Sequence, residues 1–337
     1  MVTAPPASNT WVTHPWVAHS QATIRFGIAA GPRTDWLTVR DFGQTVEGLG
    51  FDSYWYFDHP LLGPDCWTML SGLSLATSRM RLGSLVSCVY YRHPVNLARM
   101  ASDVDRMSGG RLVLGVGIGD FDFEFERMGI PMPSIRERQH ALEETLIISN
   151  GLLRSTEPVT FAGRHFQVTN TTLLGATPAE PRIPIMLGGG GERVTLRQVA
   201  QYADASNLSE SRHAGSARTS DDVVRKYSVL QSHCEAHGRP YDSVLRTHMP
   251  LYLLLGETQA AADAKLGQLS PIGRQLVMDS VMALTPAQAI TYFRGLVAAG
   301  VQYFIPAING NDVETVRLLA KEVVPAVQEI RGETDGS

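Results

Sequence analysis

The chain has 337 residues, of which 44% are hydrophobic and 18% charged, so it can bury a sizeable core and is not a disordered protein. A formal net charge of −4 excludes a general basic surface and argues against nucleic acid as the main partner. The three cysteines, Cys66, Cys88 and Cys234, contain no CxxC pair, which excludes a zinc ribbon or a disulfide framework and favours a reducing cytoplasm. No apolar run approaches the ~18 residues of a membrane helix, so no membrane partner is expected.

Residues 1–23 have neither the basic start nor the apolar stretch of a signal peptide, and we predict a flexible or draped tail there. From Ile24 onward, short apolar runs alternate with longer amphipathic segments, which is typical of parallel strands covered by helices. The predicted strands are 24–30, 53–57, 81–87, 112–117, 183–188, 205–208, 245–255 and 302–306. The predicted helices are 35–49, 67–77, 94–107, 135–153, 192–203, 221–237, 258–266, 274–284, 286–299 and 312–330.

Eight such units predict one closed (β/α)8 TIM barrel of the α/β class rather than an open sheet. Division by about 150 residues per domain suggests two domains, but barrels commonly exceed that size as one unit. Residues 159–174 hold two β-rich runs around Ala162-Gly163, which predicts a hairpin inserted into the barrel. The predicted organisation is a tail at 1–23, one barrel domain at 24–330 with the 159–174 insertion, and a tail at 331–337.

The active site of such a barrel lies at the carboxyl ends of its strands. His59 follows the second strand there and can move protons near neutral pH, with Asp58 beside it to orient the ring. The alternative is a histidine satisfied in a turn. After the fourth strand, Gly115, Gly117 and Gly119 allow close approach of a ligand, and Asp120 is a possible acid or base or else a solvated rim residue.

Four glycines, Gly188, Gly189, Gly190 and Gly191, follow the fifth strand and precede Arg193 at a helix start. Their backbone N–H groups can form an anion site, so we predict phosphate binding, with a merely flexible loop as the alternative. Neither a dinucleotide fingerprint nor a P-loop is present. The spacing of a metal site or a GxSxG hydrolase is also absent, so no metal is expected.

Several segments together resemble the bacterial luciferase-like superfamily, especially its branch that uses the deazaflavin coenzyme F420. They are FGI at 26–28, GFDSYWYFDH at 50–59, RLGSLVSCVYYRHP at 81–94, MSGGRLVLGVGIGD at 107–120 and IMLGGGGERVTLRQVAQYADASN at 185–207. The resemblance covers about Ile24 to Val327.

The resemblance implies that His59 lies close to the deazaflavin ring, with Asp58 beside it. It implies a non-proline cis peptide, a bulge behind the flavin, near Ser84, Leu85 and Val86. It also places cofactor phosphate on the tetraglycine segment, with Gly117 at the cofactor. Related sugar-phosphate dehydrogenases have a glutamate where this chain has Asp120, which would make Asp120 the proton donor or acceptor through a side chain one methylene shorter.

The resulting hypothesis is a homodimeric, F420-dependent oxidoreductase that transfers a hydride between the deazaflavin C5 and a small organic substrate. His59 or Asp120 would manage the proton. Aromatic residues near the strand ends favour an apolar or conjugated substrate, and those expected to contact it are Trp55, Tyr90, Tyr91 and Phe121. The alternatives are an FMN-dependent monooxygenase that uses reduced flavin and O2, and a non-catalytic barrel that binds a ligand or a subunit.

Overall fold

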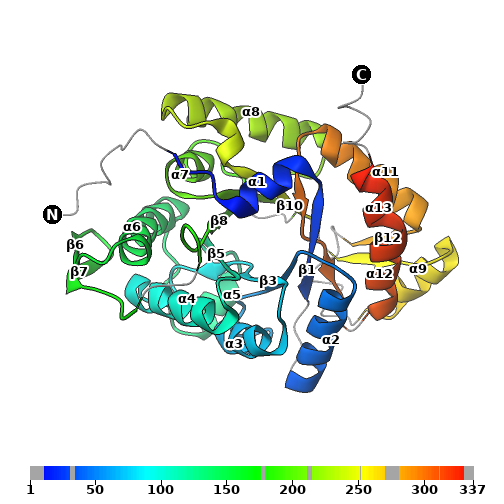
Figure 1. Cartoon of the computed structure of the whole chain (residues 1–337), viewed down its shortest axis with the longest axis horizontal. Helices are drawn as coiled ribbons and strands as arrows, with labels where there is room; N and C mark the ends of the chain where they lie inside the picture. Colours follow the sequence, from blue (N-terminus) through cyan, green and yellow to red (C-terminus); the bar gives the residue numbers. More distant parts are fainter. Residues whose placement is uncertain are drawn as a thin grey trace.

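The protein folds as a closed barrel of parallel strands inside a ring of helices (Figure 1). The computed structural model describes residues 11–30, 35–175, 179–210, 215–250, 252–269, 281–310 and 312–329. The barrel strands are β1 (Arg25–Ala30), β2 (Ser53–Tyr56), β3 (Arg81–Ser84) with its continuation β4 (Ser87–Cys88), β5 (Leu112–Gly117), β8 (Ile185–Gly188), β9 (Ala205–Ser209), β10 (Leu245–Met249), and β13 (Tyr303–Phe304) with its continuation β14 (Ala307–Ile308). They follow chain order, and β13 closes the barrel by pairing with both β10 and β1. The predicted (β/α)8 barrel is confirmed.

The covering helices begin where side chains cap the first turn. Asp35 accepts from the Thr38 backbone N–H ahead of α2, and Thr219 forms a reciprocal capping box with Asp222 ahead of α8. The helices around the barrel are α2 (Trp36–Gly48), α3 (Cys66–Ala76), α4 (Pro94–Ser108), α6 (Ile135–Arg154), α7 (Thr195–Tyr202), α8 (Ser220–Ala236), α11 (Pro286–Ala298), α12 (Val313–Leu318) and α13 (Val324–Gln328), the last two joined by a π turn over Leu319–Val323. Among the described residues, no helix is both long enough and apolar enough to cross a bilayer.

The segment expected to be an N-terminal tail contains a helix, α1 (Pro15–Ala22), that closes the amino-terminal end of the barrel. The His14 side chain caps it, and the Arg25 guanidinium, at the start of β1, donates to the Trp16 carbonyl. Trp16 is fully buried and packs 6.3 Å from Trp55 and 5.7 Å from Tyr303, ring centroid to centroid. In Figure 1, α1 lies across the strands. Residues 1–10 and 330–337, which hold the rest of the predicted tails, lie outside the described residues.

Several predicted boundaries are wrong, and prolines explain two of them. The predicted strand 245–255 splits at Pro250 into β10 and β11 (Leu253–Leu255). The last strand, predicted at 302–306, is β13 only, and pairing resumes after Pro306 as β14. Proline has no N–H to donate to a strand ladder. The predicted strand 81–87 is interrupted by a cis peptide between Leu85 and Val86, where the resemblance implied one.

Two helix predictions also change. The helix expected at 192–203 begins at Thr195 and follows a turn. Of the helix expected at 274–284, residues Met282–Leu284 form a strand, β12, that pairs with β11 beside the barrel, and 274–280 lie outside the described residues. Two short helices, α5 (Asp122–Arg127) and α9 (Gln259–Gly267), complete the elements that concern the site and its surroundings.

The predicted hairpin insertion is confirmed as an antiparallel pair, β6 (Val159–Ala162) and β7 (Gln167–Thr171). It projects beyond α6 at one edge of the molecule (Figure 1). The Glu144 carboxylate of α6 accepts the backbone N–H groups of Arg164, His165 and Phe166 in the hairpin turn. The Glu144 carboxylate therefore fixes the turn to α6, in addition to the pairing between the two strands.

Candidate active site

A cavity of about 270 Å³ opens at the carboxyl ends of the barrel strands, where the fold places catalytic residues. Its wall is mixed: Phe57, Ile118 and Met249 are among the apolar lining residues, and Asp120 and Arg138 are among the charged ones. Nine of the residues predicted from the sequence line it together: Asp58, His59, Leu85, Val86, Tyr91, Gly117, Asp120, Gly188 and Gly189.

His59 is oriented by Glu124, a residue that sequence reasoning missed. The Nδ1 atom of His59 lies 2.9 Å from Oε2 of Glu124, which belongs to the first turn of α5 and is fully buried. The same carboxylate accepts from the Tyr91 hydroxyl at 3.1 Å and from the Leu61 backbone N–H at 3.2 Å. The Phe121 ring packs against the imidazole in a tilted arrangement, with ring centroids 4.7 Å apart. Tyr91 and Leu61 therefore fix the Glu124 carboxylate, and Glu124 and the Phe121 ring in turn position the His59 side chain.

The two members of this pair shift each other's protonation. Burial disfavours the charged imidazolium, but the hydrogen bond to Glu124 and the charge of Asp120 outweigh burial and raise the pKa of His59. Burial disfavours the ionised form of Glu124 as well, but the hydrogen bonds from His59, Leu61 and Tyr91 stabilise that form more strongly. The pKa of Glu124 is therefore lowered. An ionised carboxylate only accepts, so Nδ1 carries the hydrogen and Nε2 is the atom free to exchange a proton with a molecule in the cavity.

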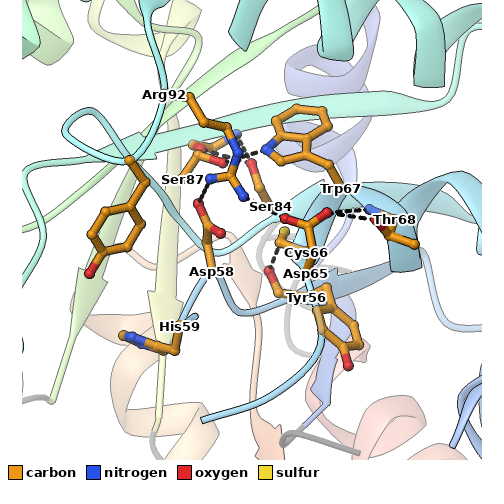
Figure 2. Close-up of polar contacts among 12 residues, drawn as sticks. Tyr56, Asp58, His59, Asp65, Cys66, Trp67, Thr68, Ser84, Ser87 and Arg92 are labelled. Carbon is orange, nitrogen blue, oxygen red and sulfur yellow. Dashed lines mark hydrogen bonds and ion pairs between the residues drawn. The ribbon is translucent and has the colours of Figure 1, made fainter. Parts of the chain in front are cut away.

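Asp58 does not orient His59 as the sequence suggested. Its carboxylate lies 2.5 Å from Nη1 of Arg92, and Nη2 of Arg92 reaches Asp65 at 2.7 Å. Figure 2 shows the Asp58 side chain directed toward Arg92 and Ser87 while His59 extends away from it. Burial raises the pKa of Asp58, with Arg92 opposing that shift. Asp58 therefore anchors the loop after β2 to the loop after β4, and its backbone carries His59 into the cavity.

The Leu85–Val86 bulge is accommodated by glycines on the neighbouring strands. A Cβ added at Gly117 would lie 2.6 Å from Cγ2 of Val86, and one at Gly188 would lie 3.0 Å from the same atom. A Cβ at Gly115 would lie 1.9 Å from the Ser84 carbonyl oxygen, and the Ser84 hydroxyl donates to the Gly115 carbonyl. These glycines let Val86 project into the cavity. Ser84 itself is fully buried behind it.

The tetraglycine loop is held by the buried Lys226 of α8. Its Nζ donates to the Gly190 carbonyl at 2.8 Å and lies 3.5 Å from the Glu192 carboxylate. A Cβ at Gly190 would lie 2.3 Å from the Gly215 carbonyl oxygen, and Gly189 has a φ of +116°, which favours glycine. The loop is thus fixed rather than merely flexible. Gly190 and Gly191 continue away from the cavity, and Arg193 is exposed.

The remaining predicted site residues divide between the cavity and the core. Asp120 lines the cavity close enough to affect His59. Trp55 does not: it is fully buried inside the barrel, with its indole N–H donated to Ser53, so the expectation that it contacts substrate is wrong. Of the two predicted tyrosines, Tyr90 packs against Phe125 and Tyr91 lines the cavity.

Arg138 of α6 is a second residue that sequence reasoning missed. It lines the cavity, is 8% exposed, and its Nη1 donates to the Gly119 carbonyl at 2.6 Å. This contact fixes the glycine turn that carries Asp120. The only sequence signals were indirect: Glu124 lies between two phenylalanines, and Lys226 is one of three lysines in the chain. The cavity can therefore hold a small molecule beside one histidine positioned to exchange a proton.

Comparison with known proteins agrees with this architecture. The sequence profile of the luciferase-like monooxygenase family matches residues 16–307. An F420-dependent glucose-6-phosphate dehydrogenase from Microbacterium testaceum is 26% identical over 90% of this chain and 98% of its own length. A 4-hydroxyprotoasukamycin monooxygenase from Streptomyces nodosus is 26% identical over 60% of this chain and 54% of its own length. The solved coenzyme F420-dependent tetrahydromethanopterin reductase of Methanopyrus kandleri has the same fold, with a TM-score of 0.74, 19% identity, and coverage of 90% of this chain and 99% of that one.

Proposed function

The chain belongs to the luciferase-like monooxygenase family, and on that basis we propose that it is an F420-dependent oxidoreductase acting on a small organic substrate. When bound, F420 would supply a deazaflavin C5 that accepts or donates a hydride. The full-length similarity to an F420-dependent dehydrogenase supports this choice of cofactor.

The residues present fit a deazaflavin. The Leu85–Val86 bulge offers an apolar surface, and Gly117 and Gly188 make room for the Val86 side chain because a Cβ at either position would crowd it. We propose that these residues hold the ring system. Gly188, Gly189, Gly190 and Gly191 would hold the phosphate-bearing tail through backbone N–H groups, with Arg193 as an exposed cation nearby.

The observation that carries the proposal is the His59–Glu124 pair at the cavity wall. Hydride transfer to or from an alcohol or a carbonyl needs a group that takes up or delivers one proton, and positioned acid–base groups contribute about 10²–10⁴-fold to such steps. His59 has its Nδ1 occupied by Glu124, which leaves Nε2 for the substrate. Asp120 is the second candidate, because it lines the same cavity.

The substrate class follows from the cavity wall. Phe57, Ile118 and Met249 present apolar surface, and the carboxylates of Asp120 and Asp122 also line the cavity. Together they favour a small apolar or conjugated molecule over a polyanion. A panel of secondary alcohols with F420, and of conjugated carbonyls with reduced F420, followed by F420 absorbance under anaerobic conditions, tests this. We expect turnover with at least one class.

The competing function is an FMN-dependent monooxygenase, and the similarity to a monooxygenase supports this alternative. Oxygen uptake coupled to reduced FMN, with no reaction of F420 across the panel, would overturn the F420 proposal in favour of this alternative.

We also propose a cytoplasmic homodimer. Light scattering on the purified chain tests the oligomeric state.

A further inference from the structure

A cluster of possible metal ligands lies outside the cavity, between α6 and the hairpin turn. Glu137 and His140 come from α6, and His165 comes from the turn between β6 and β7. The atoms that these three side chains offer as ligands all lie within 4.8 Å of one another. All three residues are partly buried. Two imidazoles and one carboxylate are a donor set that suits zinc and similar divalent transition metals.

Hydrogen bonds within the protein hold the hairpin turn in position without a metal ion. Glu137, His140 and Glu144 are spaced i, i+3 and i+7, which places them on one face of α6. Glu144 accepts from the backbone N–H groups of residues 164, 165 and 166, at 2.7, 2.9 and 2.9 Å. A Cβ at Gly163 would lie 2.3 Å from Oε2 of Glu144, so glycine is needed for this approach. His165 is therefore presented to α6 by a rigid turn.

The ligand atoms of His165 and Glu137 remain available for a metal ion. Nε2 of His165 is buried and makes no hydrogen bond in the described part of the chain, although it lies 3.4 Å from Oε2 of Glu137. Arg164, an exposed residue, pairs with Oε1 of Glu137 at 2.8 Å and leaves Oε2 directed at His165. An exposed ion pair of this kind contributes only about 0–1 kcal/mol and is easily displaced.

We propose that Glu137, His140 and His165 bind one divalent transition metal ion of the zinc class, which clamps the hairpin insertion to α6. Three protein ligands leave a fourth position of a tetrahedral site for water. The sequence did not reveal this site, because only the Glu-x-x-His spacing on α6 is local and the third ligand follows 25 residues later on another element.

Zinc titration of tag-free, chelator-treated protein by calorimetry tests the proposal. We expect one saturable site per chain and a rise in the melting temperature on addition of Zn²⁺. His140→Gln and His165→Gln should each weaken binding at least tenfold. His237→Gln, which removes an exposed imidazole just after α8, should leave binding unchanged.

Cobalt provides a second readout in case one variant folds poorly. Co²⁺ at this site should give visible ligand-field bands in the wild type and in His237→Gln, and Glu137→Gln should reduce them. No saturable zinc site, or zinc binding that is equal in wild type, His140→Gln and His165→Gln, would overturn the proposal and leave the cluster as an ion pair only.

Discussion

His59, in the loop after β2, and Glu124, in α5, form a partly buried hydrogen bond of 2.9 Å between Nδ1 and Oε2 at the mouth of the barrel. Because Glu124 also accepts from Tyr91 and Leu61, its carboxylate cannot turn away without losing two further bonds. This pair sets both the orientation and the pKa of the one histidine that we propose exchanges a proton with substrate.

Removing the charge of Glu124 should lower the pKa of His59. In Glu124→Gln the imidazolium loses its partner while burial still disfavours it, so the apparent pKa falls. Ring-nitrogen NMR titration measures this, with the His59 signals assigned by their loss in His59→Gln. Turnover near neutral pH should fall about tenfold or more, since acid–base groups contribute about 10²–10⁴-fold. Glu126→Gln, on the exposed side of the same helix, is the matched control. An unchanged His59 pKa would contradict the assigned role of Glu124.

The glycine opposite the bulge should control cofactor binding. Gly117→Ala places a Cβ 2.6 Å from Val86, so one of the two must move. We expect F420 affinity to fall at least tenfold and stability to fall by about 1–3 kcal/mol, the usual effect of overpacking.

Two variants separate this clash from a general effect of alanine. Gly48→Ala in α2 meets nothing within 4 Å and should leave F420 affinity unchanged. Val86→Ala added to Gly117→Ala removes the atom involved in the clash and should restore part of the affinity. Equal affinities of wild type and Gly117→Ala would show that the bulge does not form the cofactor surface.

Breaking the Asp58–Arg92 pair should destabilise the protein. Arg92→Met leaves the Asp58 carboxylate buried without its cation, a change that typically costs about 3–5 kcal/mol. Adding Asp58→Asn removes the stranded charge and should recover part of the loss in free energy of unfolding. Denaturant unfolding measures both. Arg40→Met, which breaks the exposed pair with Asp41, is the control and should change the free energy of unfolding by less than about 1 kcal/mol. A similar loss in Arg92→Met and Arg40→Met would contradict this prediction.

Glu210 should make stability depend on pH. Burial raises its pKa to about 7, with Tyr292 and Arg218 opposing the shift. An unfolded glutamate titrates near 4.3, so between these values the folded protein binds more protons and the free energy of unfolding falls as the pH rises. The full change in the free energy of unfolding is about 4 kcal/mol. Glu210→Gln should flatten this slope, whereas Glu257→Gln at the surface should not. A wild-type slope retained in Glu210→Gln would contradict the prediction.

The barrel could be predicted from sequence because its strands are apolar on both faces and alternate with amphipathic helices. The loop after β2 and the glycines after β5 and β8 followed from their positions at strand ends. The helix α1 could not be predicted, since its burial depends on the open end of the barrel that Trp16 fills. Its sequence has no helical periodicity to reveal it.

The partners in the site were harder to predict than the residues themselves. Asp58 looked like the partner of His59 because it is adjacent, but neighbouring side chains of an extended segment point to opposite sides. Glu124 is 65 residues away and reaches His59 only because α5 turns back over the cavity. Lys226 likewise acts on the glycine loop from α8. Such contacts depend on tertiary geometry rather than spacing.

We propose above that the cavity at the carboxyl ends of the barrel strands binds a deazaflavin. Equilibrium titration of the purified protein with F420 and, in parallel, with FMN, followed by fluorescence, tests it most directly. We predict saturable F420 binding at micromolar concentration or below, weakened in Gly117→Ala and unchanged in Gly48→Ala. Micromolar binding of FMN with no binding of F420 would contradict the account.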